Sequence, residues 1–129
     1  MSSSTATLCF LPVATLRSEP FSLDWGDSVF AKVVAVNSYG NSLESSEGNG
    51  AKIITAPDAP ENLVNNAAAT SSSQIGLSWA APLSDGGSEI TSYTVSYDLE
   101  SNGAYFIPIA SGVTTTSFIA YGMSKGSTY

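Results

Sequence analysis

The residues of this chain that could act chemically are its carboxylates, its hydroxyls and a single thiol. The 129 residues include 11 Asp and Glu, 23 Ser, 11 Thr and one Cys, but no His. A nucleophilic serine or cysteine needs a neighbouring base, and general acid–base catalysis needs paired groups in one pocket. No Gly-x-Ser-x-Gly sequence or phosphate-binding loop occurs, and spacing identifies no partner for Ser72, Ser73 or Asp85. The sequence therefore predicts a protein that is not an enzyme and binds no cofactor.

Metal and nucleic-acid sites also lack the residues that they need. Transition-metal sites in proteins use His or several Cys ligands, and the acidic residues nowhere form the Asp-x-Asp-x-Asp-Gly pattern of a calcium loop. The four basic residues against 11 acidic ones give a formal net charge of −7, which repels phosphate backbones. We expect neither a metal nor a nucleic-acid partner, and we attribute the excess of carboxylates to solubility.

Cys9 and the N-terminal segment bear on the cellular compartment. The lone thiol of Cys9 is either a buried small hydrophobe or half of a disulfide whose partner lies outside this chain. The first basic residue is Arg17, so residues 1–17 lack the basic start of a signal peptide. No run of 18 apolar residues occurs. We therefore expect membrane attachment only through parts outside this chain.

The elements that must position these side chains are predicted to be short strands. Period-2 alternation of apolar residues marks strands at 29–36 and 75–79 and a further strand at 90–97, where the apolar side takes the odd positions from 93. A shorter strand is predicted at 51–55, and Gly and Pro separate the strands. Residues 105–109 and 114–121 are strand-like but less regular. No eleven-residue window shows a capped helical stripe. Hydroxyl residues, about a quarter of the chain, suit exposed strand faces and turns. The fold class is therefore predicted to be all-β, an antiparallel β-sandwich.

An internal repeat supports this prediction. The sequences Leu23-x-x-Gly26-x-x-Val29 and Met123-x-x-Gly126-x-x-Tyr129 share one form, and their glycines lie 100 residues apart. This distance is about the length of one small sandwich domain. Each sequence predicts a corner in which glycine permits a sharp crossover before the first inward residue of the next strand.

These motifs resemble the fibronectin type III module, an immunoglobulin-like sandwich. Pro57, Pro60 and Leu63 look like its strand A, Ile75-x-Leu77-x-Trp79 like strand B, and Tyr93-x-Val95-x-Tyr97 like strand C. The two glycine motifs look like E–F corners, residues 29–36 like strand F, and Ile53 and Ile54 like strand G. The sequences Asn37-Ser38-Tyr39-Gly40 and Pro57-Asp58-Ala59-Pro60 are also similar to repeats in large surface proteins of ciliates.

The resemblance implies two partial modules. Residues 1–56 look like the C-terminal part of one module, with strands E to G, and residues 57–129 like the N-terminal part of the next, with strands A to E and the E–F corner. Val29 departs from the family pattern, which has a tyrosine at this corner. The predicted structural core consists of Trp79, Tyr93, Val95, Tyr97, Leu77, Val33, Ala35 and Ile53.

Candidate binding surfaces are the predicted loops 37–50 and 83–89, because sandwiches display recognition residues at their loop ends. Trp25, Tyr39, Tyr105 and Phe106 also lie in predicted loops, where we favour a role in pinning those loops over one in binding.

The resemblance implies a structural or adhesive repeat segment of a larger extracellular or cell-surface protein, with proteins as partners. These partners are other copies of the chain or neighbouring modules, and the proline-containing linker 56–60 would set the angle between units.

The alternative is a self-assembling filament, in which hairpin 29–55 of one chain completes the 57–129 sandwich of another. The linker from Thr55 to Leu63 reaches at most about 30 Å, which disfavours completion within one chain. The candidate strand-exchange residues are Val29, Ala31, Val33, Ala35, Ile53 and Ile54.

Overall fold

The structure of the chain is a computed structural model that describes residues 8–48, 50–98 and 103–122. The chain forms two compact units. The first comprises residues 1–55 together with Gly86–Ser88, and the second comprises residues 56–85 and 89–129. The chain divides after Thr55, and the short Gly86–Ser88 segment also belongs to the first unit.

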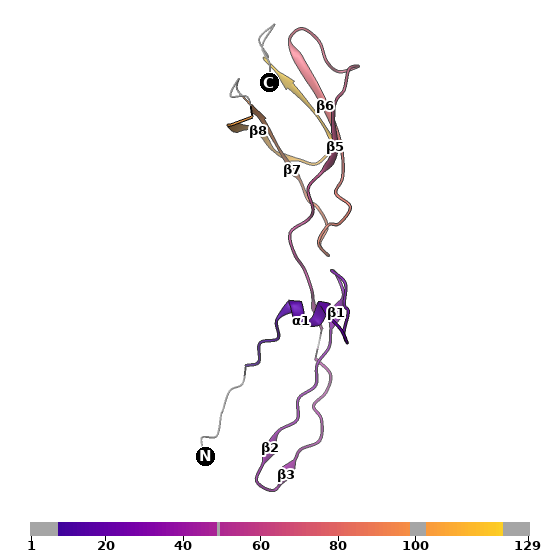
Figure 1. The fold of residues 1–129 in the computed structure, drawn as a ribbon, viewed down its shortest axis with the longest axis vertical. Coiled ribbons are helices and arrows are strands. Elements are labelled where there is room, and N and C mark those ends of the chain that lie inside the picture. The colour runs from indigo at the N-terminus through magenta and orange to yellow at the C-terminus, as the bar shows by residue number, and fades with distance from the viewer. Residues whose placement is uncertain (1–7, 49, 99–102, 123–129) are drawn as a thin grey trace. The chain divides into compact units, whose positions relative to one another are not determined.

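The second unit is built from two antiparallel sheets (Figure 1). One sheet has the order β5-β6-β9, with β5 at Glu61–Asn65, β6 at Gln74–Ala80 and β9 at Ser117–Tyr121. The other pairs β7, Tyr93–Asp98, with β8, Phe106–Val113. The all-β fold of antiparallel sheets that the alternating sequence predicts is confirmed.

The turn between β5 and β6 is held by polar contacts. Thr70 Oγ1 accepts a hydrogen bond from the backbone N–H of Gly76 at 2.9 Å and lies within hydrogen-bonding distance of Asn65 Oδ1. Gln74 Nε2 donates to the carbonyl of Ala69 at 2.8 Å, and Asn66 N donates to the carbonyl of Gly76 at 2.7 Å. These bonds fold residues 66–73 back over β6, where Gly76 is buried.

The first unit contains a long hairpin (Figure 1). Its open end is the pairing of β1, Ser28–Val29, with β4, Ala51–Lys52, and its closed end is the pairing of β2, Val36–Asn37, with β3, Gly40–Asn41. The predicted loop 37–50 is therefore wrong. The turn consists of Ser38 and Tyr39 alone, since Asn37 already pairs with Gly40. Asn37 Oδ1 accepts a hydrogen bond from Tyr39 N at 2.9 Å, and this bond stabilises the turn.

A short helix and the first predicted corner pack against the base of this hairpin. The helix α1 spans Val13–Arg17, and its Leu16 is buried. Gly26, at φ +95°, occupies the left-handed region as the corner requires, and its N–H donates to the carbonyl of Ile53 at 2.8 Å. Leu23 and Val29 are half-buried on either side of it.

The core of the described residues is small. Its buried hydrophobic side chains are Leu16 and Ile53 in the first unit and Val95 and Ala120 in the second. Val33, with 70% of its surface exposed, and Ala35 lie outside any core, contrary to the prediction, because no described strand covers their face of the hairpin. Cys9 is exposed, so its interpretation as a buried thiol is also wrong. None of the helices in the described part of the chain has the length and apolar character needed to cross a membrane.

Candidate interaction site

An apolar groove opens between the two sheets of the second unit. Its cavity of about 220 Å³ is lined by Leu77 and Trp79 from β6, by Tyr93 and Val95 from β7, and by Leu63 from β5. Pro60, Thr94 and Ser96 complete the wall, so that no charged side chain lines it. We call this cavity the Trp79 groove. An adjoining cavity of about 190 Å³ shares Leu63 and Leu77 and continues the opening toward Ala120.

Two aromatic residues form the floor of the Trp79 groove. The rings of Trp79 and Tyr93 meet edge to face, with centroids 5.4 Å apart and planes at 71°. Trp79 Nε1 is buried and has no hydrogen-bond acceptor in the described structure. A buried indole N–H ordinarily finds an acceptor, and leaving one unsatisfied costs about 1–3 kcal/mol. The interior around Trp79 is therefore incompletely packed, and it lacks a hydrogen-bond acceptor for the indole N–H.

The edge of β7 explains why the groove is open. β7 pairs with β8 on one side, and among the described residues no strand pairs with its other edge. In immunoglobulin-like sandwiches the strand corresponding to β7 is flanked by a further hairpin, which covers this side of the core. An unpaired edge presents backbone N–H and C=O groups that can hydrogen-bond to an added strand.

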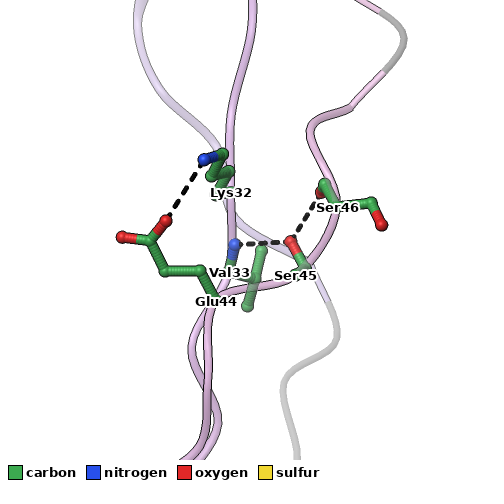
Figure 2. A network of polar contacts seen from close by, with 5 residues as sticks. All are labelled: Lys32, Val33, Glu44, Ser45 and Ser46. Atoms are coloured by element: carbon green, nitrogen blue, oxygen red, sulfur yellow. Dashed lines mark hydrogen bonds and ion pairs between the residues drawn. The ribbon is translucent and has the colours of Figure 1, made fainter.

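Serine hydroxyls replace part of the backbone ladder in the hairpin of the first unit. Val33 N donates to Ser45 Oγ at 2.9 Å while Ser45 N donates to the carbonyl of Val33 at 2.9 Å, and Ser45 Oγ donates in turn to the carbonyl of Ser46 (Figure 2). Ala35 and Ser42 repeat this arrangement, with an Oγ contact of 2.9 Å. Ala31, Val33 and Ala35, which are two residues apart, therefore pair with Gly48, Ser45 and Ser42, which are three residues apart.

A charged pair on the surface accompanies this ladder. Lys32 Nζ lies 3.2 Å from Glu44 Oε2, and both side chains are at least half exposed (Figure 2). Exposed pairs of this kind contribute at most about 1 kcal/mol. The pair therefore adds little stability, and it leaves Val33 on an uncharged face of its strand.

The hairpin exposes an unusual amount of apolar surface. Val33 and Val36 are 70% and 72% exposed, and Leu43 is 93% exposed. Phe30 and Ile54 are also largely exposed. Exposed apolar side chains gathered on one element indicate a candidate interaction surface.

The structure brings together some of the predicted site residues and separates others. Four predicted core residues, Trp79, Leu77, Tyr93 and Val95, line the Trp79 groove, and Tyr97 lines the adjoining cavity. Of the strand-exchange residues, Ile53 is buried and Val29 is half-buried, whereas Ala31 and Ile54 are exposed with Val33 and Ala35. The second predicted corner, Met123, Gly126 and Tyr129, lies outside the described residues.

The predicted loop aromatics differ in their environments. Arg17 stacks on Trp25, with its Cζ 4.1 Å from the ring centroid, so this ring helps to hold its loop. Tyr39 is 98% exposed at the hairpin turn and pins nothing, which contradicts the expectation for that residue. Tyr105 and Phe106 are also largely exposed.

Sequence reasoning missed two contributions. The family resemblance places Leu63 on a strand but does not identify it as a groove residue. Ser42 and Ser45 fall within the predicted loop 37–50, so their role in the hairpin is not predicted. The spacing Ser42-x-x-Ser45-x-x-Gly48 opposite an alternating strand is the signal that could have revealed the ladder. In the part of the chain that the structure describes, no three metal-ligating side chains gather at one point.

Comparison with known families shows what this architecture is. The sequence pattern of the fibronectin type III domain matches residues 58–129, more than half of the chain. The chain belongs to the fibronectin type III family. The match begins two residues before Pro60 and includes every strand that forms the Trp79 groove.

A solved structure shares the fibronectin type III-like fold. The chain is similar to a crystal structure of domains from titin, with a TM-score of 0.54 and 22% sequence identity. The similarity covers 80% of this chain and 33% of the titin chain, so this chain spans about a third of the length of that structure. At this identity the similarity concerns the fold alone.

Proposed function

We propose that this chain is a non-catalytic structural and adhesive repeat segment of a larger extracellular or cell-surface protein. The observation that carries the proposal is the fibronectin type III match over residues 58–129, since modules of this family typically serve as structural or adhesive units. The groove and the hairpin agree with this role, because both are apolar surfaces suited to binding protein. The partners are neighbouring modules or other copies of the chain.

The proposal includes a tandem arrangement. In this arrangement residues 1–56 are the C-terminal part of one module, and residues 57–129 are the N-terminal part of the next. The Gly26 corner followed by a long hairpin supports this assignment, since these elements end a fibronectin type III module.

A second candidate function is self-assembly into a filament, in which hairpin 29–55 of one chain completes the 57–129 sandwich of another. Two observations favour it: the hairpin exposes Val33 and Ala35, and no described strand covers the second edge of β7.

Labelling of intact cells tests the proposed location and role. An antibody raised against residues 58–129 is applied to living source cells, before and after permeabilisation, and mild external protease treatment follows. We expect labelling without permeabilisation and its loss after protease. Labelling that requires permeabilisation would contradict a surface role, whatever the assembly state of the purified chain.

A further inference from the structure

We infer that the Trp79 groove binds the strand containing Val33 from a second copy of this chain, which pairs along the open edge of β7. The inference deepens the self-assembly role proposed above by naming the site, the segment that occupies it and the face that is buried. It rests on four properties of the described residues: size, shape, charge and hydrogen bonding.

The dimensions of the groove and of the strand agree. β7 has six residues and so spans about 20 Å, while residues 29–35 extend over about 23 Å. The face of that strand with Val33 carries small side chains, Ala31 and Ala35, on either side of it. The groove floor is formed by the large rings of Trp79 and Tyr93. Small residues opposite large ones are what close packing between sheets requires.

Charge and hydrogen bonding also agree. No charged side chain lines the Trp79 groove. The strand face with Val33 is also uncharged, because the neighbouring Lys32 lies on the other face and pairs with Glu44. Docking therefore buries no unpaired charge. An added strand supplies carbonyl and N–H groups to the β7 edge, as in other cases of strand addition.

A second copy is the occupant because each chain carries both halves of the contact. The groove belongs to the second unit and the exposed strand to the first, so the contact joins different surfaces of two copies. A contact between unlike surfaces leaves one groove and one strand open at the ends of every complex, and it propagates head to tail.

The test uses the full chain, Met1–Tyr129, and one damaging substitution in each half of the contact. Val33→Asp places a charge on the docking face and disables the strand. Leu63→Glu disables the groove, and because Leu63 is 65% exposed the second unit tolerates the change. Each has a matched control on the other face of its strand: Val36→Asp, at a residue of almost equal exposure, and Val64→Glu, at the residue adjacent to Leu63.

Light scattering over a tenfold range of concentration reports the molar mass. We expect the mass of the wild type and of both controls to rise in whole-protomer steps. Each damaging variant alone stays monomeric, with a dissociation constant raised by about a hundredfold or more. Circular dichroism matching the wild type confirms that each variant is folded.

Mixing the two damaging variants is the decisive step. The Leu63→Glu chain keeps an intact strand and the Val33→Asp chain an intact groove, so an equimolar mixture should form a complex of one chain of each. A monomeric wild type, or a mixture that remains monomeric, overturns the inference. If the two control variants lose assembly while the two damaging variants keep it, the strand faces assigned to the contact are wrong. None of these results affects the cell-surface labelling that tests the proposed function.

Discussion

The hydroxyl of Thr70 joins several polar groups at the turn between β5 and β6. This hydroxyl accepts the N–H of Gly76, a buried residue. In Thr70→Val that N–H loses its acceptor while the shape of the side chain is kept, and we expect the free energy of unfolding to fall by about 1–3 kcal/mol. Urea unfolding measures the change. Thr114→Val, at an exposed position, is the control and should change stability by less than about 0.5 kcal/mol.

The two ladder serines permit a more local prediction. Ser42→Ala and Ser45→Ala remove the oxygens that accept the N–H groups of Ala35 and Val33. The bonds are solvent-exposed, so each contributes only about 1 kcal/mol, and the exchange rate of the affected amide should rise about fivefold. Hydrogen exchange followed by NMR resolves the two amides separately. Ser46→Ala, which removes a hydroxyl outside the ladder, should leave both rates unchanged.

At the scale of the element, the turn between β5 and β6 depends on a glycine. A methyl group at Gly76 would lie 2.6 Å from Ala69 Cβ and 2.9 Å from the carbonyl oxygen of Asn66. Both belong to the turn that folds over β6, so Gly76→Ala must displace it. We expect a loss of about 1–3 kcal/mol in urea unfolding, typical of overpacking.

Gly48→Ala is the matched control for this substitution. Its nearest neighbour, the carbonyl oxygen of Ala31, would lie 3.4 Å from the new methyl group, a distance that a small shift accommodates. Equal losses from the two substitutions would contradict the role assigned to the β5–β6 turn.

At the scale of the whole molecule, assembly and stability should be linked. The described core is small, and the open groove leaves apolar surface uncovered within one chain. Docking of a second copy stabilises only the folded state, so the melting temperature should rise with protein concentration. A concentration one hundred times the dissociation constant adds about 2.7 kcal/mol. Calorimetry at several concentrations measures this rise, which should be absent in Val33→Asp.

The net charge gives a second prediction at this scale. Each copy carries −7, so the copies repel one another at low ionic strength, while the proposed contact itself buries no charge. Raising the salt concentration from about 0.05 M to 0.5 M screens this repulsion and should strengthen association. Sedimentation velocity measures the shift. Weaker association at high salt would show that ion pairs hold the copies together.

The fold class and most of the strands follow from the amino-acid pattern alone. Alternation of apolar residues places β6 within one residue of its predicted limits, because a strand buried on one face leaves a period of two. β7 begins at Tyr93, where the alternation begins, three residues after the predicted start at Ile90. The same alternation identified Trp79, Tyr93 and Val95 as residues that face the interior, since large apolar residues at alternating positions share one face of a strand. The five-residue helix α1 was missed, because it is too short to show a helical period.

Which of these strand faces are covered depends on long-range packing, which the alternating pattern does not show. The alternating residues at 29–36 look like a core strand, yet Val33 and Ala35 are exposed, because burial depends on whether another strand lies opposite. The pairing of the two arms of the hairpin likewise depends on hydroxyl contacts between residues seven and twelve positions apart. Local pattern specifies which way a side chain points from its strand, whereas long-range pairing specifies what it meets there.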